Sequence, residues 1–129
     1  MLAGVHTQAG SPTQALALLT EALAIVERTQ EHWFEAELHR LRAEALLAGS
    51  PRDVAEAEAS LHRALAVARG QGAKFWELRA AITLARLRRD QGKPSEAVKL
   101  LAPVYGWFTE GFDTLDLKKA KALLDELAA

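Results

Sequence analysis

Three copies of one spacing pattern of apolar residues constrain the fold of this chain more than any other feature. The copies begin at Ala15, Ala57 and Ala97, which are 42 and 40 residues apart. Each copy places apolar or small residues at positions i, i+4, i+7, i+8 and i+11, which share one face of an α-helix. A unit that recurs at this period predicts an array of helices that bury their faces against one another. The three sets are Ala15, Leu19, Ala22, Leu23 and Val26; Ala57, Leu61, Ala64, Leu65 and Ala68; Ala97, Leu101, Val104, Tyr105 and Phe108.

A short segment with glycine and proline precedes each copy. The three segments are residues 10–12, 49–51 and 92–94, which read Gly-Ser-Pro, Gly-Ser-Pro and Gly-Lys-Pro. Glycine ends helices well because it tolerates the left-handed conformation, and proline is favoured in the first turn of the next helix. Each segment is therefore predicted to be a tight turn between two helices.

Partner helices are predicted between the three striped helices. Residues 33–48 carry one apolar face and residues 74–91 carry another, and an aromatic pair stands at the start of each. The alternation of partner and striped helices predicts stacked α-helical hairpins. The expected faces are Leu38, Leu41, Ala45 and Ala48 in the first partner helix, and Leu78, Ala81, Ile82 and Ala85 in the second.

The chain is predicted to be one all-α domain over residues 1–129, a superhelix of about three hairpins. Half of its residues are hydrophobic, and alanine and leucine, both strong helix formers, dominate them. The units are a truncated repeat over 1–30, repeats over 31–70 and 72–110, and a capping helix over 113–128. Residues 2–10 resemble residues 84–92, so the first hairpin is expected to lack half of its first helix, as in a fragment of a longer protein or in a free-standing adaptor whose start codon lies within an array. The expected apolar face of the capping helix is Leu117, Ala120, Leu124 and Leu127.

Charge and cysteine content exclude several classes of function. The 16 basic and 17 acidic residues give a formal net charge of −1, so there is no overall field to attract nucleic acid or a membrane surface. The absence of cysteine excludes disulfides and thiolate metal sites and suits a cytoplasmic protein. No signal peptide and no membrane-spanning apolar segment is visible.

The striped helices resemble the second helix of the tetratricopeptide repeat, which carries Ala-x3-Phe-x2-Ala. Ala15-Leu19-Ala22 and Ala57-Leu61-Ala64 match this spacing closely, and Ala97-Leu101-Val104 matches it loosely. The resemblance implies a binding scaffold. The units here are longer than the family's repeat of about 34 residues, and the family's first-helix signature is absent.

A second resemblance covers nearly the whole chain. Residues 37–42, 55–58, 71–74, 77–79, 84–87 and 105–127, above all 105–114, look like the C-terminal repeat region of bacterial signalling proteins. Those proteins join a class III adenylate/guanylate cyclase domain, or a winged-helix transcriptional regulator domain, to an AAA-type ATPase. The resemblance implies a sensor or assembly role in signal transduction. The chain has no phosphate-binding Gly-x4-Gly-Lys-Ser/Thr loop of its own, so ATP binding is not expected of it.

The candidate chemical groups do not form a catalytic or metal-binding pattern. His32 and His39 are seven residues apart with Glu35 between them, so a metal site is conceivable, but a surface position for His39 is favoured. The turn serines lack a neighbouring base and are expected to cap helices. We therefore expect a non-enzymatic protein without a cofactor or a bound metal.

Binding residues are expected on the surface made by the first helices of the hairpins, where repeat arrays usually bind their ligands. The expected function is protein–protein interaction with a protein or peptide partner. Self-association into a homo-oligomer and small-molecule sensing in the same groove are alternatives. The basic residues Arg86, Arg88, Arg89 and Lys93 are expected mainly to place favourable positive charge at a helix C-terminus, and contact with an acidic partner is the alternative. The candidate partner-binding residues are Glu37, Arg40, Glu44, Arg79 and Arg86, with the aromatic residues Trp33 and Trp76.

Overall fold

The computed structural model describes residues 12–29, 34–49, 53–112 and 114–128, and these residues form α-helices without a strand. The expected all-α fold is therefore confirmed. The helices follow one another as α2 (Pro12–Thr29), α3 (Glu35–Gly49), α4 (Val54–Gln71), α5 (Lys74–Asp90), α6 (Pro94–Trp107) and α7 (Leu115–Ala128). The start of the first hairpin, expected before residue 11, lies outside the described residues.

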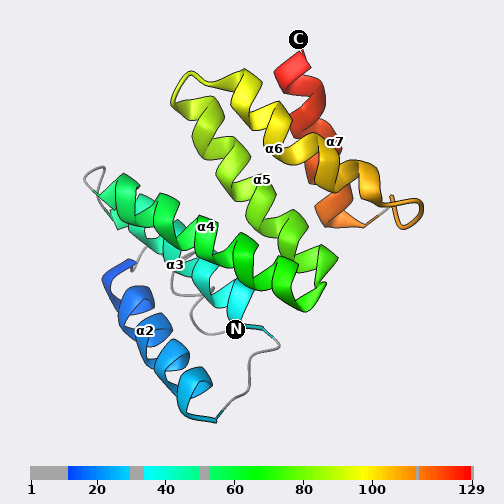
Figure 1. Ribbon diagram of the computed structural model, residues 1–129. Helices are drawn as coiled ribbons and strands as arrows, with labels where there is room; N and C mark the ends of the chain where they lie inside the picture. The colour runs from blue at the N-terminus through cyan, green and yellow to red at the C-terminus, as the bar shows by residue number, and fades with distance from the viewer. Residues whose placement is uncertain (1–11, 30–33, 50–52, 113, 129) are drawn as a thin grey trace.

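The helices (Figure 1) fall into two sets, which differ in whether their members contact one another. Each helix contacts its neighbours in sequence, so α3 pairs with α4 and α5 pairs with α6 as antiparallel hairpins. In addition α3 contacts α5 and α5 contacts α7, whereas α2, α4 and α6 make no comparable backbone contact with each other among the described residues. We call α3, α5 and α7 the first helices, and α2, α4 and α6 the second helices.

The turns between helices follow the expected chemistry where they are described. Gly72 ends α4 with φ of +66°, and its N–H bonds to a carbonyl of the last turn. This left-handed conformation strains any residue with a Cβ, which explains a glycine at this position. Pro94 occupies the first turn of α6, where the missing N–H leaves no intrahelical bond unmade. The segments around Ser11 and Ser50 lie outside the described residues.

The repeated stripes form most of the core of the second helices. All five stripe residues of α4 are buried, and Ala15, Leu19, Ala97 and Leu101 are completely buried. The third copy differs at its end, because α6 stops at Trp107 and Phe108 is extended, with ψ of 136°. Phe108 is nevertheless buried, since leaving the helix lets its ring pack on Phe75 at a centroid distance of 5.1 Å.

The apolar faces of the first helices are close to those expected, with two corrections. Leu38, Leu41 and Ala45 are buried in α3, but Ala48 is exposed because it lies in the last turn, beyond the packed part of α3. In α7 the buried set is Leu117, Ala120 and Leu123, while Leu124 and Leu127 are half-buried. The difference arises because α7 packs against both α5 and α6, which rotates its buried face.

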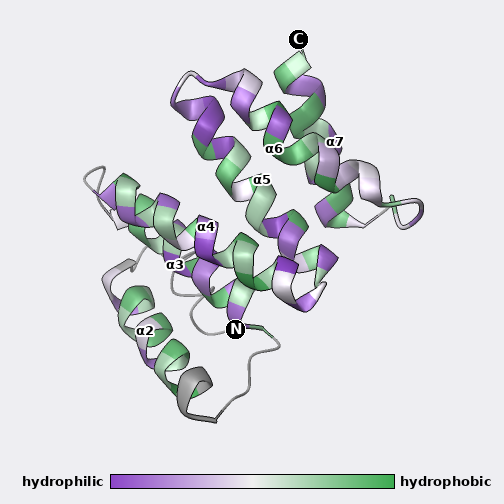
Figure 2. Ribbon diagram, in the orientation of Figure 1, coloured by the Kyte–Doolittle hydropathy of each residue, from purple (hydrophilic) through white to green (hydrophobic). Residues whose placement is uncertain are grey.

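Apolar and polar residues alternate around the helices (Figure 2). The buried residues form one large cluster across α3–α7 and a second cluster between α2 and α3, and Leu16 packs against both. Within the described residues, no helix has the length and apolar character needed to span a membrane. The core is therefore continuous along the array through Leu16, and the outer helix faces are mainly polar.

Candidate functional site

Five of the seven expected binding residues lie together on the first helices. Arg40, Glu44, Arg79 and Arg86 line one pocket of about 80 Å³, and Glu37 is bonded to two of them. We call this the first-helix pocket. Its lining is completed by Ile82, Thr83, Asp116 and Lys119.

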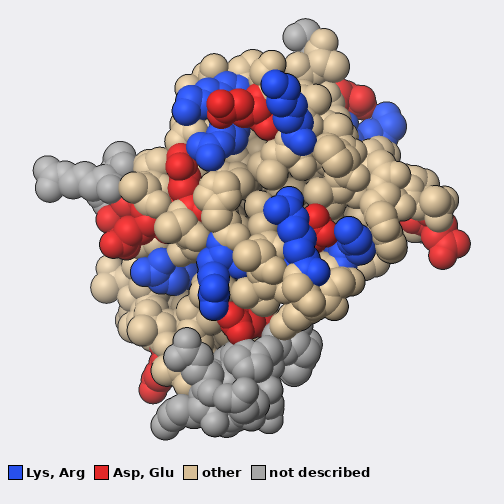
Figure 3. All heavy atoms as spheres, in the orientation of Figure 1, with Lys and Arg blue, Asp and Glu red and all other residues tan. Residues whose placement is uncertain are grey.

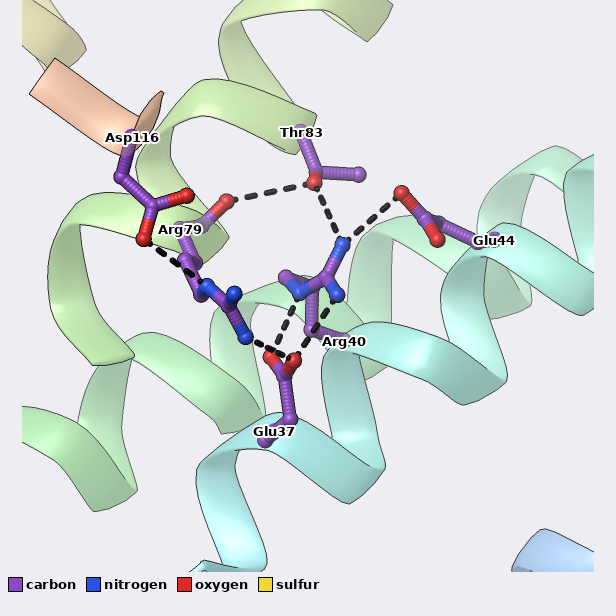
Figure 4. A network of polar contacts seen from close by, with 6 residues as sticks. All are labelled: Glu37, Arg40, Glu44, Arg79, Thr83 and Asp116. Carbon is purple, nitrogen blue, oxygen red and sulfur yellow. Dashed lines mark hydrogen bonds and ion pairs between the residues drawn. The ribbon is translucent and has the colours of Figure 1, made fainter. Parts of the chain in front are cut away.

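Glu37 is the centre of an ion-pair network in this pocket (Figure 4). Its side chain is buried at 5% exposure, in the first turn of α3. Arg40 donates to both oxygens of the carboxylate, Nε to Oε1 at 2.6 Å and Nη2 to Oε2 at 2.9 Å. Arg79 of α5 donates Nη1 to Oε2 at 2.6 Å. The buried negative charge is therefore compensated from its own helix and from the next first helix.

The two arginines extend the network in opposite directions. Arg79 donates Nε to Oδ2 of Asp116 at 3.0 Å, which connects α5 to α7. Arg40 donates Nη1 to Oε1 of Glu44 at 2.8 Å, and the same nitrogen lies 3.5 Å from the hydroxyl of Thr83. Among the described residues, no buried side-chain nitrogen or oxygen lacks a hydrogen-bond partner. The network therefore links all three first helices.

The charge of Arg40 is stabilised by these carboxylates. Burial by itself would lower the pKa of the Arg40 guanidinium, but the hydrogen bonds and negative charges of Glu37 and Glu44 outweigh burial and raise that pKa. Arg40 therefore stays charged, and its hydrogen-bonding capacity is used inside the protein. The network has the features of a structural element that joins neighbouring helices.

Two cations of the pocket are not used by the network. Arg86 and Lys119 line the pocket, and neither has a carboxylate within ion-pair distance among the described residues. Lys119 is exposed and Arg86 is half-buried. The pocket therefore offers two positive groups to an anionic ligand, beside acidic groups that are already paired.

Of the two aromatic residues expected to bind a partner, Trp76 lies within the described residues. Trp76 is half-buried at the start of α5, and the guanidinium of Arg79 lies 5.5 Å from its ring centroid. This cation–π contact orients the arginine that bridges Glu37 and Asp116. Trp33 lies outside the described residues.

Sequence reasoning missed Thr83, Asp116 and Lys119 as members of the site. A signal for Asp116 was present, because the acidic residues of the pairs Glu37-Leu38, Glu77-Leu78 and Asp116-Leu117 lie in the first turns of the three first helices. In each pair the leucine is buried to 1% exposure or less. The acidic residue before this leucine is thus a repeated position, and α7 occupies the place of a further first helix.

Glu77, the middle member of this series, is also buried at 5% exposure. It accepts hydrogen bonds from Nε of Arg69 at 3.1 Å and from Nζ of Lys74 at 3.2 Å. Its partners come from the end of α4 and the start of α5, so it stabilises the turn between them. The same repeated position therefore serves two different contacts in neighbouring units.

The expected basic cluster separates into three environments. Arg88 donates to Glu58 of α4 at 3.0 Å, and Arg89 donates to Glu126 of α7 at 3.0 Å. Arg86 points to the first-helix pocket, and Lys93 is exposed before α6. Arg88 and Arg89 therefore connect neighbouring helices, and the four residues do not form one basic patch.

The histidine that was considered as a metal ligand has a local partner. His39 lies 3.4 Å from Glu35 through Nε2, and His32 lies outside the described residues. Burial lowers the pKa of His39 below its usual value of 6.5, and the neighbouring Glu35 opposes this effect only in part. In the part of the chain that the structure describes, no three histidine, aspartate or glutamate residues are grouped to hold a metal ion.

Comparisons with protein-family models, with curated proteins and with solved structures give no match to this chain.

Proposed function

We propose that this chain is a non-catalytic scaffold for protein–protein interaction, with a tetratricopeptide-like arrangement whose first helices line the inner side of a superhelix. The packing supports this orientation, because first helices contact one another directly and second helices do not. In a curved array, the helices on the inner side lie closer to one another than the helices on the outer side do. The inner surface is the usual ligand-binding surface of helical repeat proteins.

The observation that carries the proposal is the pair of unpaired cations in the first-helix pocket. Arg86 and Lys119 come from neighbouring first helices, so a ligand that contacts both must lie across the array. The neighbouring arginines Arg40 and Arg79 are held in place by the network. An acidic segment of a partner protein satisfies the two free cations without disrupting that network.

The alternative functions are less well supported by the same pocket. A small-molecule site usually has a volume of at least about 300 Å³ and a mostly apolar lining. The first-helix pocket measures about 80 Å³ and is lined mainly by charged groups. Self-association through this surface would bring the positive charges of Arg86 and Lys119 from two copies together, and these like charges would repel one another. We further propose a cytoplasmic signalling assembly as the setting, which rests on the resemblance of residues 105–114 to bacterial signalling proteins.

Peptide selection tests this proposal. A random peptide library displayed on phage is selected on the wild-type protein, and enriched peptides are synthesised and titrated by fluorescence anisotropy. We expect acidic peptides whose affinity falls about tenfold in the double variant Arg86→Glu/Lys119→Glu, because two attractive contacts become repulsive.

The matched control is the double variant Arg63→Glu/Lys118→Glu. Both of these residues are exposed and neither lines the first-helix pocket. The control changes the net charge by the same amount and should retain the affinity. Equal binding by the wild type and the Arg86→Glu/Lys119→Glu variant would exclude the pocket as the binding site.

A further inference from the structure

A second surface of the molecule exposes aromatic side chains where α5 begins and α6 ends. Trp107 is 58% exposed and Phe75 is 48% exposed, although both are large apolar residues. Each packs against the buried ring of Phe108, at centroid distances of 5.2 Å and 5.1 Å. Exposed aromatic residues grouped in this way are typical of protein interaction sites.

The orientation of Trp107 is held from two sides. The ring of Phe108 meets it edge-on at an interplanar angle of 86°, and Nζ of Lys74 lies 5.3 Å from its ring centroid. An aromatic side chain fixed before binding loses little conformational freedom when a partner covers it. Trp107 is therefore exposed and already oriented for contact.

A hollow of about 270 Å³ lies beside this ring. It opens between α4 and α6, two second helices that make no close backbone contact with each other in the described residues, and α5 crosses between them (Figure 1). We call it the aromatic hollow. Its apolar lining consists of Leu100, Pro103, Val104 and Trp107.

The rim of the aromatic hollow is positively charged. Arg69, Lys74 and Lys99 line it, and the only acidic lining residue among those described is Glu77. The carboxylate of Glu77 is buried and already accepts hydrogen bonds from Arg69 and Lys74. Lys99 is exposed and has no carboxylate within ion-pair distance in the described part of the chain. Figure 3 shows Lys and Arg side chains close to Asp and Glu side chains at several places on this face, with uncharged surface elsewhere.

We propose that the aromatic hollow is a second docking site, which binds an acidic segment of a partner protein through one large apolar side chain. The apolar side chain enters the hollow and packs against Trp107 and Pro103, and a neighbouring carboxylate pairs with Lys99. The site is independent of the first-helix pocket, because the two share no lining residue. A partner segment that engages both sites binds more tightly than either site alone allows.

The concave shape favours a protein segment over other occupants. A membrane surface contacts protruding aromatic and basic residues, whereas here the apolar groups line a hollow about the size of a side chain. A second copy of this chain would have to present an acidic aromatic segment of its own. The loop with Glu110 and Phe112 has that composition, but Phe112 already packs on Tyr105 at a centroid distance of 5.8 Å.

The test uses peptides selected from a random library displayed on phage, with the full chain as the target. The enriched peptides are titrated into variants by fluorescence anisotropy, and the indole N–H signal of Trp107 is followed by NMR. We expect peptides that combine acidic residues with a large apolar residue and shift this signal. Their affinity should fall about tenfold or more in Trp107→Ala, the loss typical of a central aromatic contact, and clearly in Lys99→Glu.

Two matched variants separate this site from general effects and from the first proposal. Phe112→Ala removes another exposed ring, and Lys118→Glu reverses another exposed lysine, and neither residue lines the aromatic hollow. Both should keep the affinity, and so should Arg86→Glu/Lys119→Glu if the bound peptide occupies the aromatic hollow alone.

Four results would overturn the proposal that the aromatic hollow is a docking site. The first is the failure of the library to yield any peptide that depends on Trp107. The second is binding that survives both Trp107→Ala and Lys99→Glu. The third is Trp107-dependent binding to phosphatidylserine vesicles without any peptide, which would assign the surface to membranes. The fourth is Trp107-dependent dimerisation in sedimentation, which would assign it to a second copy of the chain.

Discussion

At the scale of single residues, Glu37 shows how a buried charge connects helices. Its carboxylate is shared by Arg40 of the same helix and Arg79 of the next first helix. A buried ion pair contributes little net stability when it is compared with apolar residues, but loss of one partner leaves the others uncompensated. The network is therefore sensitive to the removal of its central group.

Glu37→Gln should lower the free energy of unfolding by about 2–3 kcal/mol, because two arginines lose their shared negative charge while a polar group remains. Glu44→Gln is the matched control, since Glu44 is 35% exposed and also bonds to Arg40. Its effect should stay below about 1 kcal/mol. Urea unfolding of the two variants measures the difference, and equal losses would show that Glu37 has no central role.

His39 predicts a dependence of stability on pH. Burial lowers the pKa of His39 in the folded state. As the pH falls below 6.5, the imidazole of the unfolded chain therefore binds a proton more readily than the imidazole of the folded chain. The stability contributed by neutral His39 is present above that pH and is lost as the pH falls through the pKa of the folded state. His39→Gln should therefore show a shallower loss of stability on acidification, measured by urea unfolding at a series of pH values. A parallel loss in the two proteins would contradict this.

The residues of the candidate site could be predicted only in part. Glu37, Arg40, Glu44, Arg79 and Arg86 were found because helix periodicity places them on one side of the first helices. Their pairing could not be predicted, because it depends on the register between α3, α5 and α7, which the sequence spacing leaves open. The aromatic hollow was missed for a similar reason, because the position of Trp107 beside it depends on where α6 ends and on the contacts of Trp107 with Phe108 and Lys74.

At the scale of helices and turns, two glycines near the end of α4 should respond in opposite ways to the same substitution. Gly72 has φ of +66°, so Gly72→Ala should destabilise the protein by about 1 kcal/mol. Gly70 lies within α4, and a Cβ added there would meet no atom within 4 Å. Gly70→Ala should stabilise the protein by about 0.5 kcal/mol, because alanine is the better helix former. Thermal unfolding distinguishes the two signs, and destabilisation by both changes would contradict the assigned end of α4.

Helices and turns were the most predictable level of the structure. The glycine and proline signal at residues 92–94 correctly placed the turn before α6, since this signal acts locally. The end of α6 was predicted less well, because the stripe continues to Phe108 while tertiary packing removes that residue from the helix. Local patterns thus identified the helices, and contacts distant in sequence decided their ends.

At the scale of the whole molecule, each first helix is joined to the next by a charge pair. Arg79 reaches back to Glu37 in α3 and forward to Asp116 in α7. In a linear array the loss of one such contact acts on the adjoining helices, and more distant units are little affected.

Asp116→Asn should therefore accelerate amide hydrogen exchange in α7 and leave the exchange of α2 and α4 close to that of the wild type. Asp125→Asn is the control on the same helix, because Asp125 is 67% exposed and, among the described residues, pairs only with Lys121 of its own helix. It should change α7 little. Faster exchange throughout the chain in Asp116→Asn would indicate that the array unfolds as one cooperative unit.

The two-way pairing of Arg79 also bears on how an array of this kind can change its length during evolution. A duplicated hairpin inserted before α7 would separate Arg79 from Asp116. The insertion would keep the series unbroken only if its own first helix carried an acid before the buried leucine and a base two residues after that acid. A duplication or deletion that leaves a continuous core therefore also keeps the charge pairs only if the acidic and basic residues of the adjoining units correspond.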